Sequence, residues 1–356
     1  MSANPHIKRS VAAISGYTPG EQLRRPCLVK LNTNENPYPP SPAVAAVLHD
    51  FTADDLRRYP DPVCKELRAI IAERHGVTPE QVFVGNGSDE ILALATRAFV
   101  EDDGQIGFLD PSYSLYPVLA AIRGVGALAV ALDRDFVARL PESCAAALFL
   151  LANPNAPTGR LCPIMEVEAF ARRFAGVLLV DEAYADFASD NAMRLAASRP
   201  NVLVMRTLSK SYSLAGLRLG YAVGPADLIA ALYTIKDSYN VDLLAQRIAA
   251  AALRDEAAML ANVARVRATR TRLAARLAEL GYAVTPSETN FLWVYPPARL
   301  AAQAVYARLK AQDILVRHFP GVRTGAHLRI TVGTDQEVER LLAALKALNG
   351  AGEGSL

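Results

Sequence analysis

A lysine lies just beyond an apolar run in the stretch TLSKSYSLAGLRLG, residues 207–220. Lys210 comes five residues after the end of the run 202–205, and Arg218 follows eight positions later. Burial favours the neutral form of a lysine, so an amine at the end of a buried strand can act as a nucleophile near neutral pH. The same sequence is also compatible with Lys210 as an ordinary surface lysine just past the strand. The interpretation therefore depends on the polar groups at neighbouring strand ends.

Three further apolar runs lead directly into polar residues. The run 82–84 leads into GNGSDE (85–90), the run 147–151 into NPNAPTG (153–159), and the run 177–180 into DEAY (181–184). In an open parallel sheet the carboxyl ends of the strands meet at one edge, and ligands bind there. Four such ends predict one shared site.

Each motif also has a purely structural explanation. Ser88 or Asp89 could cap a helix, NPNAPTG could be a turn set by its prolines and glycine, and Asp181 could be a cap or the partner of an arginine. GNGSDE is a poor dinucleotide-binding fingerprint, because Glu90 stands where the third glycine should be. A nicotinamide dehydrogenase would also leave Lys210 without a role.

A phosphorylated pyridine aldehyde would use all of these groups. The aldehyde needs an amine such as Lys210, and a protonated ring nitrogen needs a carboxylate such as Asp181. A phenolate oxygen needs donors such as Asn155 and Tyr184. A phosphate needs amides at a helix N-terminus and a permanent cation such as Arg218. Each of these residue types therefore has a place in this one ligand.

The motifs NPNAPTG, DEAY and TLSKSYSLAGLRLG together resemble those of the fold-type I pyridoxal-phosphate aminotransferases. Four outer stretches are similar to the histidinol-phosphate branch of that family: LNTNENPYPP (31–40), RRYPDP (57–62), FLDPSYSLY (108–116) and LRITVGT (328–334). The resemblance spans most of the chain. It implies an α/β fold with a mainly parallel central sheet flanked by helices, plus a smaller α/β domain.

The resemblance also implies roles for matching residues. Lys210 would be the Schiff-base lysine and proton shuttle, assisted by Asp181 and Tyr184. The cofactor-binding residues would be Gly87, Ser88, Tyr113, Asn155, Asp181, Tyr184, Thr207, Ser209, Lys210 and Arg218, with Tyr113 stacked on the ring and Tyr59 reaching the site of a neighbouring subunit. The substrate-binding residues would be Tyr17, Asn34, Arg317 and Arg329. A homodimer with shared sites follows from this pattern.

The implied reaction is transamination of L-histidinol phosphate with 2-oxoglutarate, as in histidine biosynthesis. An aromatic amino-acid aminotransferase, a dual-specificity enzyme or a threonine-phosphate decarboxylase would carry the same cofactor motifs, because those motifs do not contact the substrate side chain. Two positions depart from the family pattern. Ala156 replaces an asparagine common in relatives, and Arg323 in GVRTGAHLRI has no clear counterpart, so its role is open.

The elements that must position these residues fall into three parts. Residues 1–40 are rich in proline and predict an arm that packs with the small domain and the substrate site. Residues 41–250 alternate apolar runs with helical patterns and predict the large cofactor-binding domain. Residues 251–356 predict a small α/β domain. One helical pattern, from about 242 to 280, predicts a long helix that bridges the two domains.

Composition excludes several other functions. The chain carries 38 basic and 36 acidic residues, a net charge of +2 that favours neither nucleic acid nor an acidic membrane. The N-terminus lacks an apolar core of the signal-peptide type, and four cysteines without a Cys-x-x-Cys pair indicate reduced thiols of a cytoplasmic protein. Five histidines without ligand spacing predict no metal site.

Overall fold

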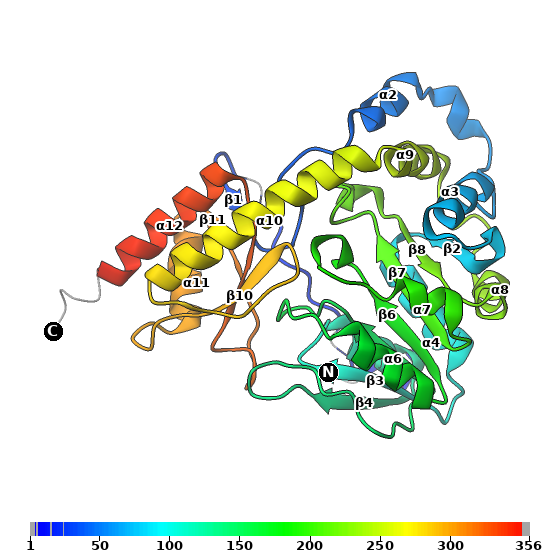
Figure 1. The fold of residues 1–356 in the computed structure, drawn as a ribbon, viewed down its shortest axis with the longest axis horizontal. Coiled ribbons are helices and arrows are strands. Elements are labelled where there is room, and N and C mark those ends of the chain that lie inside the picture. Colours follow the sequence, from blue (N-terminus) through cyan, green and yellow to red (C-terminus); the bar gives the residue numbers. More distant parts are fainter. Residues whose placement is uncertain (1–3, 5, 15, 24, 351–356) are drawn as a thin grey trace.

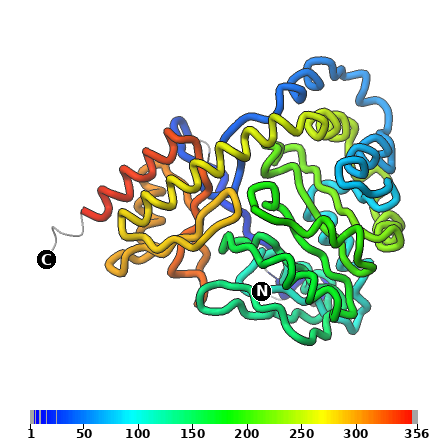
Figure 2. Tube along the Cα trace, viewed as in Figure 1, coloured from blue at the N-terminus to red at the C-terminus, as the bar shows by residue number. Residues whose placement is uncertain are grey.

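The computed structural model describes residues 4, 6–14, 16–23 and 25–350. Two α/β lobes lie side by side, and helix α10 (Glu256–Glu279) runs from one to the other (Figure 1). The large lobe holds α2 to α9 around a seven-stranded sheet, and the small lobe holds β9 to α12 around a four-stranded sheet. The N-terminal arm, blue in Figure 2, passes between the two lobes.

The large sheet has the strand order β2-β8-β7-β6-β5-β3-β4. Neighbours from β4 to β7 are parallel, whereas β8 is antiparallel to both β2 and β7, so the prediction of a mainly parallel sheet is confirmed. The strands are β2 (Val82–Gly85), β3 (Gln105–Asp110), β4 (Gly126–Ala131), β5 (Leu148–Ala152), β6 (Val177–Asp181), β7 (Val202–Thr207) and β8 (Gly220–Val223). The sequence did not reveal β4, an exposed, alanine-rich edge strand with weak β-propensity.

Alternate side chains of the sheet pack against helices on opposite faces. Phe149 and Val180 belong to one apolar cluster, and their neighbours Leu150 and Leu179 belong to another. The period of two explains why strands covered on both faces read as continuous apolar runs. Helices of the first cluster are α2 (Pro42–Asp50), α3 (Lys65–His75), α6 (Ile164–Arg173), α7 (Met193–Ser198), α9 (Leu243–Arg254) and the first half of α10; those of the second are α4 (Gly87–Phe99), α5 (Leu115–Arg123) and α8 (Ala226–Ile235).

The expected single helix over 242–280 is two helices, so that prediction is wrong. Asp255 separates α9 from α10, and its carboxylate accepts a hydrogen bond from Ala258 N (3.3 Å) and another from the Ser41 hydroxyl. A side chain that satisfies the first amides of a helix marks its start, which favours a break at this position. Only α10, with 24 residues, crosses to the small lobe.

The small lobe has its own apolar cluster, contributed by one face of α10 and by the elements that follow it. Its sheet is antiparallel, with the order β12-β13-β10-β9. The arm joins this lobe, because β1 (Val29–Lys30) pairs with β11 (Ile314–Leu315) and Leu31 belongs to the same cluster. The other elements are β9 (Ala283–Val284), β10 (Phe291–Tyr295), α11 (Ala302–Ala311), β12 (Arg317–His318), β13 (Leu328–Thr331) and α12 (Asp335–Gly350).

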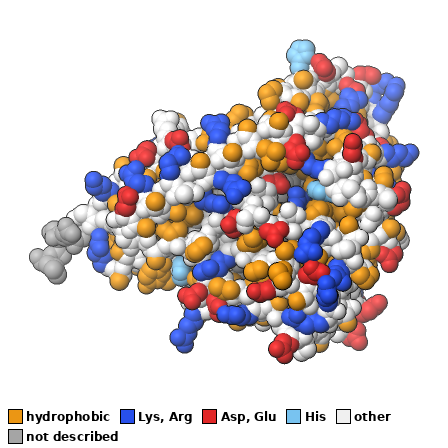
Figure 3. Space-filling model, viewed as in Figure 1, with side chains coloured by type: hydrophobic (Ala, Val, Ile, Leu, Met, Phe, Trp, Pro, Cys, Tyr) orange, Lys and Arg blue, Asp and Glu red, His pale blue; other side chains and the backbone are white. Residues whose placement is uncertain are grey.

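Charged side chains of both signs are interspersed over the face shown in Figure 3. All four cysteines are free, with Cys64 and Cys162 buried and Cys27 exposed. In the part of the chain that the structure describes, no helix has the length and apolar character needed to cross a membrane. The same residues contain no group of three His, Cys, Asp or Glu side chains that could hold a metal ion.

Candidate active site

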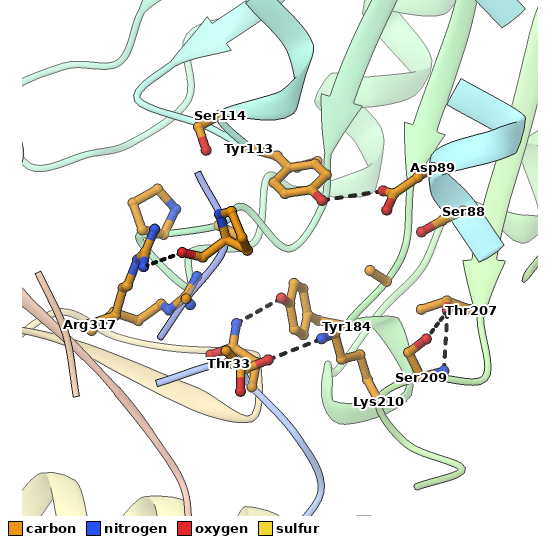
Figure 4. A pocket seen from close by; sticks show the side chains of 18 of the residues that line it. Thr33, Ser88, Asp89, Tyr113, Ser114, Tyr184, Thr207, Ser209, Lys210 and Arg317 are labelled. Atoms are coloured by element: carbon orange, nitrogen blue, oxygen red, sulfur yellow. Dashed lines mark hydrogen bonds between the residues drawn. The ribbon is translucent and has the colours of Figure 1, made fainter. Parts of the chain in front are cut away.

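A cavity of about 240 Å³ lies where the two lobes and the arm meet. Figure 4 shows Arg317 at one end of this cavity and Ser88 and Ser209 at the other. The predicted residues that line it are Tyr17, Asn34, Ser88, Tyr113, Asp181, Tyr184, Thr207, Ser209, Lys210, Arg218, Arg317 and Arg329. Segments far apart in the sequence therefore meet at the carboxyl edge of the large sheet, as expected for an α/β fold.

Lys210 lies in the turn that follows β7, and its side chain points into the cavity. Its amine lies 3.4 Å from the Thr33 carbonyl oxygen and 5.9 Å from the centroid of the Tyr184 ring. Asn36 Nδ2 holds the Lys210 carbonyl oxygen at 3.1 Å. Burial, together with the nearby charge of Arg329, lowers the pKa of Lys210 to about 8. The neutral amine is therefore accessible near physiological pH and can act as a nucleophile or a base.

Asp181 ends β6 and is only 6% exposed. The Tyr116 hydroxyl donates to Oδ2 (2.9 Å) and the Ala183 amide donates to Oδ1 (3.1 Å). Burial raises the pKa of Asp181 to about 6, and the bond from Tyr116 opposes that rise. A carboxylate buried beside the cavity in this way is suited to pair with a cation inside it.

Among the described residues no arginine pairs with Asp181, and the nearby Arg206 binds the neighbouring Glu182 instead. Arg206 donates twice to Glu182 Oε2, at 2.8 and 2.9 Å, and also reaches Asp186 at 3.3 Å. Asp186 in turn accepts from the hydroxyl of Ser211. This network links the chain after Asp181 to the chain after Lys210 and so fixes both backbones.

The N-terminus of α4 supplies one side of an anion-binding cradle. The helix begins at Gly87 directly after β2, and no described side chain caps it, so the expected alternative of a cap from Ser88 or Asp89 is not observed. Gly87 has φ +78°, and a Cβ there would lie 2.8 Å from Arg218 Nη2. Only glycine lets the guanidinium approach the uncapped amides, where an anion is favoured.

Hydroxyls and a guanidinium form the other side of the cradle. Thr207 Oγ1 donates to Ser209 Oγ (3.0 Å), and Arg218 Nη1 donates to the same oxygen at 3.4 Å. Arg218 Nη2 lies 3.5 Å from Asp89 Oδ2. The cradle therefore combines a permanent cation, two hydroxyls and a helix terminus, the groups that bind phosphate.

Two tyrosines line the cavity between its ends. The Tyr113 hydroxyl donates to Asp89 Oδ1 (3.2 Å), and its ring meets that of Tyr17 edge-on, with centroids 5.7 Å apart. The Tyr184 hydroxyl accepts from Asn34 Nδ2 (2.8 Å), which leaves its own proton free to donate. Burial raises the pKa of both Tyr113 and Tyr184, so both remain neutral donors.

Asn155 lies behind the wall of this cavity and does not line it. Its Nδ2 donates to the Pro111 carbonyl (3.1 Å) and to Thr158 Oγ1 (2.9 Å), while Oδ1 accepts from Ser112 Oγ (2.7 Å). Both amide hydrogens are therefore used within the surrounding loops. A bond from Asn155 to the cofactor stays a prediction and requires one of these partners to give way.

The far end of the cavity carries two arginines that are direct cross-strand partners on β12 and β13. Arg317 donates to the arm carbonyls of Thr18 (2.8 Å) and Pro19 (3.0 Å). Arg329 donates to the Asn32 carbonyl (2.9 Å), and its buried Nε has no partner among the described residues. Burial lowers the pKa of Arg329. An unpaired, buried guanidinium donor beside a second arginine indicates a site for an anion.

Tyr59 lies outside the cavity wall. It is 80% exposed, and its ring stacks on Tyr239 with centroids 4.3 Å apart. Its predicted contact with a cofactor in a neighbouring subunit stays a prediction.

Sequence reasoning missed three contributors to the cavity and its support. Tyr116 donates to Asp181, Thr33 accepts from Lys210, and Asp89 meets both Tyr113 and Arg218. Tyr116 has a sequence signal, because it lies three residues after Tyr113 in the start of a helix. Thr33 has none, since it acts through its backbone carbonyl.

Comparison with known proteins gives consistent results. The family described as aminotransferase class I and II matches residues 26–345. A protein named histidinol-phosphate aminotransferase 2 from Thiobacillus denitrificans is 48% identical over 344 residues, 95% of this chain and 96% of its own. A histidinol-phosphate aminotransferase from Aromatoleum aromaticum is 47% identical over 348 residues, 94% and 97% of the two chains.

Solved structures agree at the level of the fold. Histidinol-phosphate aminotransferase from Sinorhizobium meliloti, described in complex with pyridoxal-5'-phosphate, superposes with a TM-score of 0.90 at 27% identity, covering 98% of this chain and 99% of that one. A Thermus thermophilus aspartate aminotransferase mutant gives a TM-score of 0.82 at 21% identity, covering 97% and 100%. The second similarity supports the fold alone.

Proposed function

This chain belongs to the class I and II aminotransferases, and we propose that it transfers the amino group of L-histidinol phosphate to 2-oxoglutarate in histidine biosynthesis. The products are imidazole acetol phosphate and glutamate. Relatives at 46 to 48% identity that cover nearly the whole chain carry the name histidinol-phosphate aminotransferase. The alternatives considered from the sequence, an aromatic aminotransferase and a threonine-phosphate decarboxylase, are not favoured by these relatives.

The observation that carries the proposal is the second anion site at the far end of the cavity. A cofactor phosphate would occupy the cradle of Ser209 and Arg218, so the cross-strand pair Arg317 and Arg329 remains for the substrate. A phosphate on the amino donor and a carboxylate on 2-oxoglutarate can both accept from guanidinium forks. The same pair therefore serves both half-reactions.

The residues present fit pyridoxal 5'-phosphate. The buried Asp181 carboxylate has a pKa raised by burial to about 6 and lacks a cationic partner among the described residues, which a protonated pyridine nitrogen would provide. Gly87 leaves the α4 terminus open to a phosphate, and Lys210 offers an amine of lowered pKa. When bound, this cofactor withdraws electrons from the carbon bonded to the substrate nitrogen and so makes its proton acidic.

Three side chains of the protein have separate roles in the reaction. Lys210 Nζ, with a pKa that burial lowers to about 8, accepts the proton of the substrate carbon and later donates it to a different carbon. Asp181, held by Tyr116 and Ala183, keeps a negative charge at the sheet edge. The hydroxyl of Tyr184, oriented by Asn34, donates into the cavity between them. Each group is held in place by a bond that does not involve the substrate, so little reorganisation is needed during the reaction.

We also propose a cytoplasmic homodimer with shared sites. Tyr59 is strongly exposed and held flat against Tyr239, near exposed apolar Leu56. An exposed tyrosine with a fixed ring and a free hydroxyl suits contact with a second copy. Sedimentation should give a dimer mass, and mixing inactive Lys210→Ala chains with inactive Tyr59→Ala chains should restore part of the activity. A monomer with full activity would rule out shared sites.

A direct test compares amino donors in steady-state kinetics. Histidinol phosphate should give a higher kcat/KM than phenylalanine or tyrosine. Arg317→Ala should lower kcat/KM for histidinol phosphate about 100-fold, the cost of losing a charge-assisted pair, and change the value for phenylalanine much less. If phenylalanine is preferred and Arg317→Ala leaves the rates unchanged, the phosphate assignment is wrong.

A further inference from the structure

The loop that joins β12 to β13, residues 319–327, is bonded to the large lobe through Arg323. Its Nη1 donates to the carbonyl of Asp110 (2.6 Å), and its Nη2 donates to the carbonyls of Leu132 (2.7 Å) and Asp133 (3.0 Å). These carbonyls lie at the ends of neighbouring strands β3 and β4. One guanidinium of the small lobe thus joins two strand ends of the large sheet.

An aromatic contact supports the same junction. Phe136 of the large lobe meets the rings of Trp293 and His327 edge-on, with centroids 6.2 and 5.1 Å away. His327 stacks flat on Trp293 at 5.0 Å. The His327 amide also donates to the Thr324 carbonyl (3.0 Å), and the Gly325 amide donates to the carbonyl four residues earlier (2.8 Å). The loop around Arg323 is therefore held in one shape at the contact with the large lobe.

Both sides of this junction carry residues of the cavity. Arg323 lies six residues from Arg317 and six from Arg329, the cross-strand pair at the substrate end. On the other side, Asp110 lies three residues before Tyr113, whose ring lines the cavity toward the cofactor end. Arg323 therefore connects the backbone of the substrate-anion site to the backbone that carries Tyr113.

We propose that Arg323 is a positioning residue that fixes the distance between the arginine pair and the cofactor end of the cavity, and so favours amino donors whose amine and phosphate are separated by that distance. The identity of the donor rests on the proposed function above. A donor engages both ends at once, and so binds tightly, only when the two ends keep one spacing. A small anion that binds the arginine pair alone does not depend on that spacing.

The test compares Arg323→Ala with a matched control in the holoenzyme. In Arg323→Ala, KM for histidinol phosphate should rise about tenfold while kcat changes less than about threefold, because ground-state and transition-state binding are weakened together. The inhibition constant of inorganic phosphate should stay unchanged. The control is Arg173→Ala, whose guanidinium also donates to two backbone carbonyls, those of Leu140 and Pro141, but within the large lobe. It should keep wild-type values.

Two other results would overturn the proposal. An unchanged KM in Arg323→Ala would show that the junction does not position the arginines. A rise in KM matched by an equal rise in the phosphate inhibition constant would show that Arg323 shapes the arginine pair itself and not its distance from the cofactor.

Further variants keep the test decisive if Arg323→Ala does not fold. Arg323→Lys retains the charge with a single donor group and should give an intermediate KM. Phe136→Leu loosens the junction from the large lobe and should raise KM in the same direction; wild-type values in both variants would refute the proposal.

Hydrogen exchange supplies a readout that does not depend on the substrate. The amides of Gly325 and His327 should exchange faster in Arg323→Ala than in wild type or Arg173→Ala, because the junction that protects them is weakened. Unchanged exchange would count against Arg323 as the anchor of the loop. Absence of turnover of histidinol phosphate by the wild type would instead refute the proposed function and leave this measurement valid.

Discussion

The two ends of the cavity are built in different ways. The cofactor end is made from residues 87–218 of one lobe, where consecutive strands of one sheet deliver short motifs to a common edge. The substrate end is made from the arm and from the β12–β13 hairpin, which are about 300 residues apart in the sequence, as the bonds from Arg317 to Thr18 and Pro19 illustrate. The cofactor end is therefore delivered mainly by short motifs of one sheet, with support from the arm at Lys210 and Tyr184, and the substrate end by contacts between separate parts of the fold.

This difference indicates which parts of the fold determine cofactor binding and which determine substrate recognition. At the cofactor end Asp181 accepts from the nearby Ala183 amide and Arg218 donates to the nearby Ala215 carbonyl, whereas Lys210 is also held by the arm, through Asn36. At the substrate end Arg329 is oriented by the arm, through the Asn32 carbonyl. Changes in the packing of the lobes should therefore alter substrate recognition before they alter cofactor binding.

The largest expected effect comes from removing the amine at the cofactor end. Lys210→Ala should lower the transamination rate about 10⁴-fold, the upper range for a lost general base, because no neighbouring described side chain offers a comparable neutral amine. Absorbance should show no visible band from covalently held cofactor after dialysis against a primary amine, whereas replacement of an exposed lysine of α12, Lys346→Ala, should leave both assays as in wild type. Retention of more than a few per cent of the activity would contradict the assignment.

An intermediate effect separates the two ends. Arg218→Ala should raise the dissociation constant of the cofactor about 100-fold, the cost of a lost charge-assisted contact, while KM for the amino donor at saturating cofactor changes little. Arg317→Ala should leave the dissociation constant of the cofactor nearly unchanged and raise KM for the amino donor. Fluorescence titration of the cofactor and steady-state kinetics measure the two constants. If the cofactor dissociation constant and KM for the amino donor rise equally in both variants, the two ends of the cavity are not independent.

The smallest expected effect is a pH-dependent change in the stability of the cofactor-free protein. Burial raises the pKa of Asp181 from 3.8 to about 6, so the folded state binds a proton that the unfolded state lacks between these values. Stability from this group is therefore present at low pH and is lost as the pH rises through about 6. Between pH 8 and 5 the wild type should gain about 1.4 kcal/mol of unfolding free energy relative to Asp181→Asn.

Urea unfolding of both cofactor-free proteins at pH 5 and pH 8 measures this difference. An equal change with pH in wild type and Asp181→Asn would show that Asp181 is not strained by burial. The result would then weaken the interpretation that the cofactor end is built around a carboxylate whose charged form is destabilised by burial.

The sequence by itself determined six strands of the large sheet and the motifs that gather at its carboxyl edge. Apolar runs covered on both faces predicted six of the strands, and the residues just after four of them predicted Lys210, Asp181 and the anion cradle, because strand ends and their loops are local features. The helical pattern of residues 242–280 predicted one helix, whereas the cap at Asp255 divides the segment into two. The pattern of apolar runs also did not predict the edge strand β4.

Only the tertiary structure decided what the distant residues contact. The bond from Tyr116 to Asp181, the enclosure of the Asn155 amide and the junction made by Arg323 each join segments separated by more than 40 residues. A local sequence pattern does not predict such contacts, because they depend on the order of the strands in the sheet and on the packing of the two lobes. The chemistry of this protein could be inferred from its motifs, whereas the bonds of Arg323 that join the two lobes became visible only in the folded chain.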